Sequence, residues 1–186
     1  MKKFAVLSLI FMLFSAGAAL AQMEPASSMW VVNGHVGYGL PLGNFSDGFD
    51  GAFVAGAGVC YMFTNMYGLE LGADWDKFPT KASSDVTWQF IPVTVDLVVN
   101  LPMSSSPIKP YIKGGVGMYF ETAEVKVLGV KVSDSTNDFG VNIGAGIKFP
   151  VAETTSIDIG ARFHNVMTES ESSQYMTFTA GVGFMF

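Results

Sequence analysis

The chain alternates hydrophobic positions with polar or small ones along most of its length. From residue 30 onward this two-residue period recurs in eight segments, with no convincing helical period of 3.6 residues. A two-residue period is typical of strands, whose successive side chains point to opposite faces. We therefore predict strands over residues 30–40, 52–63, 67–77, 88–101, 111–121, 139–149, 157–166 and 175–186.

The two faces of these segments carry different residue types. In segment 67–77, Leu69 and Leu71 lie on one face, whereas Glu70 and Asp74 alternate with glycine on the other. The same division recurs in segments 139–149 and 157–166. A glycine-rich charged face does not suit a soluble exterior, whereas an eight-stranded barrel has an interior only just wide enough for side chains. The charged face is therefore predicted to line the inside, and the large apolar face to contact lipid.

Segment lengths and connections agree with a membrane barrel. A tilted strand needs about 9–11 residues to cross a bilayer, and closure removes the sheet edges that hydrocarbon does not tolerate. The connections that follow the odd-numbered segments tend to be longer and richer in Asp, Ser and Glu than the others, as expected for external loops and periplasmic turns. The sequence predicts an all-β fold: an eight-stranded antiparallel up-and-down transmembrane β-barrel, with its N-terminus in the periplasm.

Composition removes the competing classes. The chain of 186 residues is 49% hydrophobic and 14% charged, against about a quarter charged in soluble domains. After residue 21, no stretch approaches the roughly 18 apolar residues of a spanning helix. The formal net charge of −6 argues against a nucleic-acid partner. One cysteine, Cys60, cannot form an intramolecular disulfide.

The first 21 residues have the features of a secretory signal peptide. Lys2 and Lys3 precede an apolar run, and Ala19-Leu20-Ala21 supplies small residues at a cleavage site. We predict cleavage before Gln22, which leaves 22–186 as the barrel domain; the alternative is an uncleaved membrane anchor. Export of this chain does not imply a disulfide scaffold.

The last segment resembles the C-terminal signal of bacterial outer-membrane proteins, with alternating apolar residues and a final phenylalanine. The resemblance implies that the barrel-assembly machinery reads Phe178, Val182, Phe184 and Phe186. As a whole, the mature chain resembles the small OmpA-like and OmpX-like β-barrel domain. That likeness implies a place among the lipids of the bacterial cell outer membrane, and it specifies no activity.

Counting residues back from each predicted hairpin turn shows which inward-facing charged residues lie at similar levels of the barrel. A tight turn after residue 149 sets Lys148 opposite Asp158. The same register sets Arg162 opposite Gly144, and a turn at Leu128-Gly129 sets Lys113 on the other side of that glycine. Paired residues on adjacent strands project to the same face, so these charges would share the lumen.

Two further registers extend this row. Pairing residue 101 with 108 places Asp96 beside Lys113, and pairing residue 75 with 91 places Glu70 beside Asp96. The predicted lumen charge network comprises Glu70, Asp96, Lys113, Lys148, Asp158 and Arg162. Buried charges must be paired to be tolerated, so the favoured interpretation is mutual neutralisation in a plugged scaffold. The alternative is a narrow pore for small solutes or ions, in which the pairs exchange partners.

The longest connection contains a second candidate site. Its β-prone sequence continues the predicted register around Leu128-Gly129 into a hairpin comprising Val125, Lys126, Val127, Val130, Lys131 and Val132. Such a hairpin, projecting beyond the membrane, would offer an edge strand to an extracellular partner. The alternative is that the strands are merely long and the loop packs on its neighbours.

The sequence gives little support to catalysis. Lipid A-modifying barrels need a nucleophile, a base and an orienting acid within hydrogen-bond reach, whereas His35 and His164 are both predicted to face the lumen without such partners. Two isolated histidines are equally weak evidence for a metal site. We expect no cofactor and no enzyme activity, and a structural or adhesion-like role, with a pore second and a lipid A-modifying enzyme a distant third.

Overall fold

The computed structural model of the chain describes residues 29–81, 86–102, 107–127, 130–168 and 172–186. The predicted signal peptide, 1–21, and the predicted turn at Leu128-Gly129 lie outside these residues. The strands are β1 (Met29–Leu42), β2 (Ala52–Met62), β3 (Tyr67–Pro79), β4 (Val86–Asn100), β5 (Lys109–Val127), β6 (Val130–Ala152), β7 (Thr155–Met167) and β8 (Ser172–Met185). One short helix, α2 (Phe45–Gly48), follows β1.

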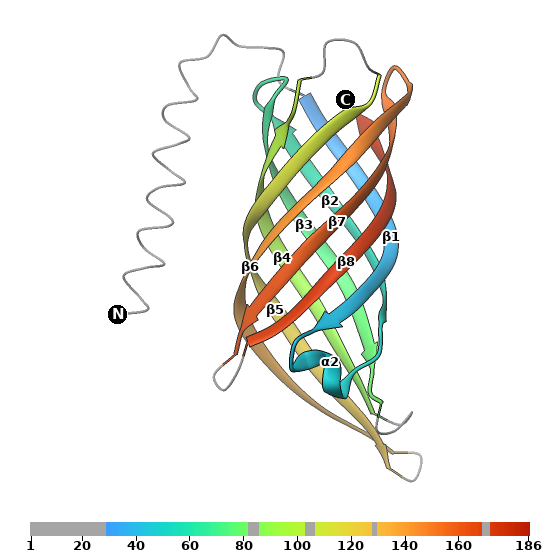
Figure 1. Ribbon diagram of the computed structural model, residues 1–186, viewed down its shortest axis with the longest axis vertical. Helices are drawn as coiled ribbons and strands as arrows, with labels where there is room; N and C mark the ends of the chain where they lie inside the picture. The colour runs from blue at the N-terminus through green and yellow to red at the C-terminus, as the bar shows by residue number, and fades with distance from the viewer. Residues whose placement is uncertain (1–28, 82–85, 103–106, 128–129, 169–171) are drawn as a thin grey trace, which may run out of the picture.

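Each strand pairs antiparallel with its sequence neighbours, and β8 returns to pair with β1. The result is the closed eight-stranded up-and-down barrel that the sequence predicts (Figure 1). We call the end where β1 begins and β8 ends the terminal end, and the opposite end, which carries α2, the loop end. In the described part of the chain, no helix has the length and apolar character needed to cross a membrane.

The two faces of the strands are those expected. Along β3 every second residue from Gly68 to Phe78 is buried, and those between are exposed. Large apolar side chains cover the outside: Ile143 is 65% exposed and Leu71 is 57% exposed. Since only lipid solvates such a surface favourably, the fold agrees with membrane insertion.

Most of the predicted hairpin registers are confirmed. Lys148 pairs with Asp158, and Gly144 lies between Lys113 and Arg162. The register that sets Glu70 opposite Asp96 is also confirmed.

The predicted β4–β5 register is wrong by two residues. Asp96 pairs with Gly115, and Lys113 pairs with Val98. The proline-containing connection is longer than the predicted pairing of residue 101 with 108 implies: Asn100 pairs with Tyr111, and Leu101 N–H donates to Pro110 O at 2.8 Å. An even shift preserves the face of every side chain, so Lys113 still points inward.

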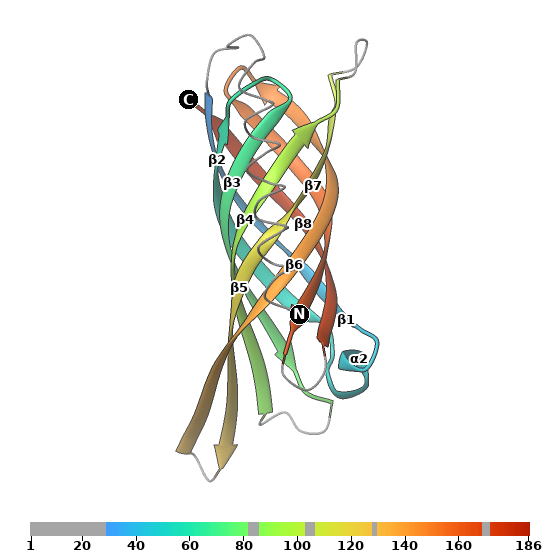
Figure 2. The ribbon, with the colours of Figure 1, turned by 90° about the vertical axis from the view of Figure 1, so that its left-hand side faces the viewer.

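Strands β5 and β6 run far past the barrel at the loop end (Figure 2). Their pairing continues outward from the barrel to Val127 opposite Val130, well beyond the predicted strand limits at 121 and 139. The register of this extension is the one predicted for the candidate surface hairpin. Pairing of β6 with β7 begins only at Phe139 opposite Met167. Between Val130 and Asp138, β5 is therefore the only described strand that pairs with β6.

The first loop packs across the loop end, which the sequence did not predict. Gly43 adopts a positive φ of 55° that favours glycine, and the chain then turns into α2. Phe45 of α2 is 8% exposed and meets Phe78 and Phe90 edge to face, with ring centroids 5.2 and 5.7 Å away. The aromatic plug, as we call this cluster, comprises Phe45, Ala52, Phe78, Phe90, Tyr119, Val166 and Tyr175.

Candidate functional site: the charged lumen

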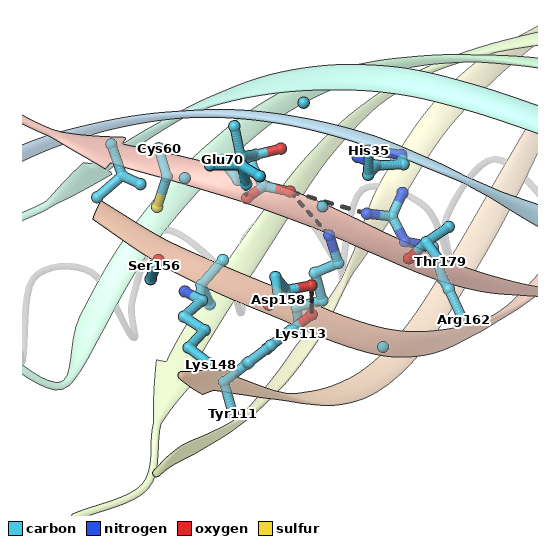
Figure 3. A pocket seen from close by; sticks show the side chains of 18 of the residues that line it. His35, Cys60, Glu70, Tyr111, Lys113, Lys148, Ser156, Asp158, Arg162 and Thr179 are labelled. Carbon is cyan, nitrogen blue, oxygen red and sulfur yellow. Dashed lines mark hydrogen bonds and ion pairs between the residues drawn. The ribbon is translucent and has the colours of Figure 1, made fainter. Parts of the chain in front are cut away.

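Arg162 is the centre of a buried ion-pair network in the middle of the barrel. Its guanidinium lies 3.3 Å from Asp74, 3.7 Å from Glu70 and 3.7 Å from Asp96. Glu70 also accepts a 2.8 Å hydrogen bond from Lys113 Nζ, and these side chains converge in Figure 3. Four of the six predicted network residues are thus brought together, from β3, β4, β5 and β7.

Two further residues belong to this network although the prediction omitted them. His35 Nε2 lies 2.8 Å from Asp74 Oδ1. The two residues occupy one row across β1, β2 and β3, separated by Gly56. A Cβ atom at Gly56 would collide with Asp74 Oδ1, so the glycine is what lets the side chains meet. The short turn at residues 64–66 indicates that Gly56 lies opposite Asp74, but the long first loop gives no signal for the β1–β2 register that adds His35.

Asp96 is held by neutral donors as well as by Arg162. Asn142 Nδ2 donates to it at 2.7 Å and Thr94 Oγ1 donates at 3.0 Å, and Asp96 is 0% exposed. These bonds satisfy a carboxylate that is too far from Arg162 for a direct hydrogen bond. A buried charge therefore stays tolerable at this position.

Lys148 and Asp158 lie nearer the terminal end, outside the contacts of Arg162. Asp158 Oδ1 accepts a 3.0 Å hydrogen bond from Tyr111, and Lys148 Nζ lies 4.7 Å from the centroid of the same ring. The two residues are neighbours in register, but Tyr111 is their common partner. The six predicted residues thus form two groups at successive levels, instead of a single row.

A third level lies between the ion pairs and the aromatic plug. Tyr175 donates to Asp76 at 2.8 Å, and its ring stacks on His164 with centroids 4.4 Å apart. His164 also contacts Tyr119 O–H at 2.9 Å and Thr177 Oγ1 at 3.3 Å. Both histidines face the lumen, as predicted, and both contact residues of the barrel wall.

Little open space remains around the ion pairs. The cavity that borders Arg162, Glu70 and Lys113 has a volume of only ≈ 50 Å³. Between this cavity and the loop end, the lumen holds fully buried side chains, among them Tyr119 and Tyr175. Within the described residues, no group of three or more His, Cys, Asp and Glu side chains is placed to hold a metal ion. The arrangement is suited to bracing the wall from inside.

The other predicted sites lie on the outside or beyond the barrel. The four residues of the predicted assembly signal form an outward row along β8 and the residue that follows it, and their exposed fractions run from 40% to 78%: Phe178, Val182, Phe184 and Phe186. The backbone of the candidate surface hairpin is paired as predicted: Val125 with Val132, Lys126 with Lys131, and Val127 with Val130.

A closed antiparallel barrel with an apolar exterior and a packed, ion-paired interior defines a small integral β-barrel of the bacterial outer membrane. The comparison with family models agrees: the chain belongs to the outer membrane protein beta-barrel domain family, whose model matches residues 7–186. A search with the sequence finds no match among curated proteins.

Solved structures of several bacterial barrels share the fold. Neisserial surface protein A is 16% identical, with 88% of this chain and all of that one covered and a TM-score of 0.63. A major outer membrane protein from Thermus thermophilus is 12% identical, with 87% and 100% covered and a TM-score of 0.63. Ail, the attachment invasion locus protein of Yersinia pestis, in complex with the heparin analogue sucrose octasulfate, is 17% identical, with 88% and 100% covered and a TM-score of 0.57. These similarities show the fold.

Proposed function

We propose that this barrel is a non-enzymatic surface-interaction protein whose projecting β6 edge binds an extended segment of an extracellular partner. The proposal takes the termini to lie in the periplasm, so that the loop end is external. The observation that carries it is that β6 projects from the barrel over Val130–Asp138 with β5 as its only described strand partner.

An edge of this kind offers main-chain hydrogen bonds to another strand. Natural proteins usually shorten, cover or charge their edge strands because an open edge pairs readily with other chains. Here, nine residues at about 3.4 Å each expose an edge about 30 Å long. That length would accommodate one typical strand of a partner by β-augmentation.

The exposed residues near the barrel rim are compatible with such docking. Ser135, Thr136 and Asn137 are exposed on β6, and Thr122 Oγ1 lies 3.3 Å from Ser135 Oγ across the β5–β6 ladder. These side chains are small and polar, so a partner strand could approach without displacing an apolar cluster. The name of the Yersinia pestis neighbour, attachment invasion locus protein, is in keeping with an attachment role for this fold.

The packed lumen supports a scaffold in preference to a pore. The aromatic plug covers the loop end, and the Arg162 network crosses the barrel between the plug and the terminal end. In a conducting lumen, the side chains of the plug and those of the network would both have to move apart. The interior then serves to hold the wall rigid, so that the projecting hairpin is presented from a fixed base.

The described lumen residues also offer no evident reaction centre. His35 is bonded to Asp74, and His164 contacts Tyr119 and Thr177, all within a narrow interior. A lipid A-modifying enzyme needs its catalytic groups where a lipid can reach them. Mass analysis of lipid A from cells with and without the protein tests this point, and we expect identical spectra.

Shortening the projecting hairpin tests the proposed function. Residues 122–135 are replaced by Asn-Gly, a two-residue sequence that closes hairpins, which keeps Glu121 opposite Thr136 and leaves only three residues of the edge. The variant is displayed on a non-adherent bacterial host. We expect attachment to cultured epithelial cells and to other bacteria to fall to the level of the host alone. The matched control, Leu128→Asn, also creates an Asn-Gly pair but retains the full edge, and it should attach like the wild type. Equal attachment by all three proteins would contradict the proposal.

A further inference from the structure

A group of sulfur-containing side chains lies at the terminal end of the lumen, away from the surface hairpin. We propose that this end binds a single soft monovalent metal ion, Cu(I), through the sulfur atoms of Cys60, Met62 and Met29. The proposal is independent of the surface-interaction function.

The two nearest sulfurs already converge. Cys60 and Met62 are two residues apart on β2, so both point inward, and Cys60 Sγ lies 3.6 Å from Met62 Sδ. An ion about 2.3 Å from both sulfurs, a typical metal–thiolate distance, would see them at an angle of about 100°, close to tetrahedral. The pair therefore needs little rearrangement to bind one ion.

A glycine makes room for both sulfurs. A Cβ atom on Gly68, the residue opposite Met62 on β3, would collide with Met62 Sδ and lie 2.9 Å from Cys60 Sγ. Any side chain at this position would push the two sulfurs away. The local backbone therefore leaves open the place where they meet.

The third sulfur comes from the neighbouring strand. Met29 is directly opposite Met62 in the β1–β2 ladder, and it packs against the buried cluster that contains Cys60 and Met62. Paired residues have Cβ atoms about 4.5–5.5 Å apart, and a methionine side chain with three rotatable bonds adapts easily. Met29 is thus placed to complete a three-sulfur set.

This end of the barrel is also open and rich in methionine. A cavity of ≈ 440 Å³ lies here, and four of the seven methionines in the described residues line it: Met29, Met62, Met66 and Met185. A simple packing role would have the methionines fill the space, since this side chain commonly fills gaps in cores. Instead they border an unfilled cavity, which gives an ion a way in.

A polar group at the same place lacks a partner. Asn100 Nδ2 lies 4.0 Å from Met62 Sδ, and its buried Oδ1 atom has no hydrogen-bond partner. Buried amide oxygens are rarely left unpaired. Water carried in with the ion would satisfy this oxygen.

The donor set selects the class of metal. Thiolate and thioether ligands favour soft ions such as Cu(I), whereas carboxylates and carbonyls suit Mg²⁺ and Ca²⁺. On binding, the Cys60 S–H bond breaks, its proton passes to water and a sulfur–copper bond forms, with no change in oxidation state. The thiolate then balances the single charge of the ion, while the thioethers add none.

Titration of the folded barrel in detergent micelles tests the proposal. Cu(I) is supplied from a colorimetric Cu(I) chelator under a non-coordinating reductant, and the transferred copper is counted. We expect one equivalent in the wild type, with copper–sulfur scattering in X-ray absorption. Met62→Leu, which keeps the side-chain volume, and Cys60→Ala should each weaken binding by at least about tenfold. Met118→Leu alters an outward methionine that is 37% exposed, and it should bind like the wild type.

Each other outcome overturns the proposal. No copper transfer to the wild type, or equal transfer to Met62→Leu and Met118→Leu, would show that the sulfurs form no site. Equal affinity for Zn²⁺ would contradict the selectivity. If Cys60→Ala does not fold, Met62→Leu and Met29→Leu decide the matter, because leucine conserves the packing at both positions.

Discussion

At the scale of single residues, the lumen is organised by glycines placed beside charged side chains. Gly56 separates His35 from Asp74, and Gly144 separates Lys113 from Arg162. Each glycine gives a long polar side chain the room to cross the barrel. A narrow interior can therefore hold several charges only because their neighbours have no side chains.

Removal of Arg162 should destabilise the barrel. Arg162→Ala leaves Asp74 and Asp96 buried without their cation, and breaking a buried ion pair costs about 3–5 kcal/mol. Urea unfolding in lipid vesicles measures the loss. The control, Lys109→Ala, removes an exposed cation at the terminal end and should change stability little. Equal stability of the two variants would mean that the network contributes nothing.

Two inward glycines should respond differently to the same substitution. A Cβ atom at Gly56 would collide with Asp74 Oδ1, whereas one at Gly72 would meet its nearest neighbour, Thr94 Oγ1, at an ordinary 3.5 Å. We expect Gly56→Ala to lose about 1–3 kcal/mol by overpacking. Gly72→Ala should be neutral or slightly stabilising, because alanine restricts the unfolded chain. Unfolding midpoints that fall equally in both variants would argue against this account of the interior.

At the scale of elements, the strand period was predictable throughout, whereas two of the connections were not. Alternation assigned a face to every strand because a barrel wall separates lipid from lumen along its whole length. The β4–β5 register failed by two residues, since the period is unchanged by an even shift and only the turn fixes the pairing. Helix α2 was missed because Phe45 and Phe49 lie in a loop, where apolar residues follow no period.

The open edge of β6 should be blocked by one of two adjacent prolines. Neighbouring residues of an antiparallel strand direct their N–H groups to opposite sides, so one of Thr136 and Asn137 faces β5 and the other faces away from it. Proline lacks an N–H and is compatible with an edge. Of Thr136→Pro and Asn137→Pro, we expect one to keep the thermal stability of the wild type and to lose attachment. Attachment retained by that stable variant would speak against strand addition.

The outward aromatic row of β8 should matter for assembly more than for stability. Phe186 is 78% exposed, so little packing within the barrel is lost in Phe186→Ala. We expect less folded protein in the outer membrane of growing cells, but an unchanged unfolding midpoint after refolding into vesicles. The matched variant is Ile143→Ala. Ile143 points outward, is 65% exposed and lies outside the predicted signal, so this variant should assemble normally. Similar yields of both variants in cells would remove the special role of the last strand.

At the scale of the whole molecule, the barrel is closed at several levels. The aromatic plug, the His164–Tyr175 stack and the Arg162 network follow one another along the lumen. Purified protein in planar bilayers should therefore show no single-channel steps. We expect conductance to appear first in the double variant Phe45→Ala and Arg162→Ala, because it loosens two of these levels. Reproducible steps from the wild type would favour the narrow pore.

The pairing of the first strand with the last sets the order of events in folding. Trp30 and Phe186 exchange two main-chain hydrogen bonds, of 3.1 and 2.9 Å, across the β1–β8 seam. The barrel wall cannot close before residue 186 pairs with residue 30, even if the strand that contains residue 30 forms early. Contacts so distant in sequence form slowly, and until then the apolar faces have neither lipid nor partner. We therefore expect the barrel wall to close in one late step, when residues 30 and 186 meet at the membrane.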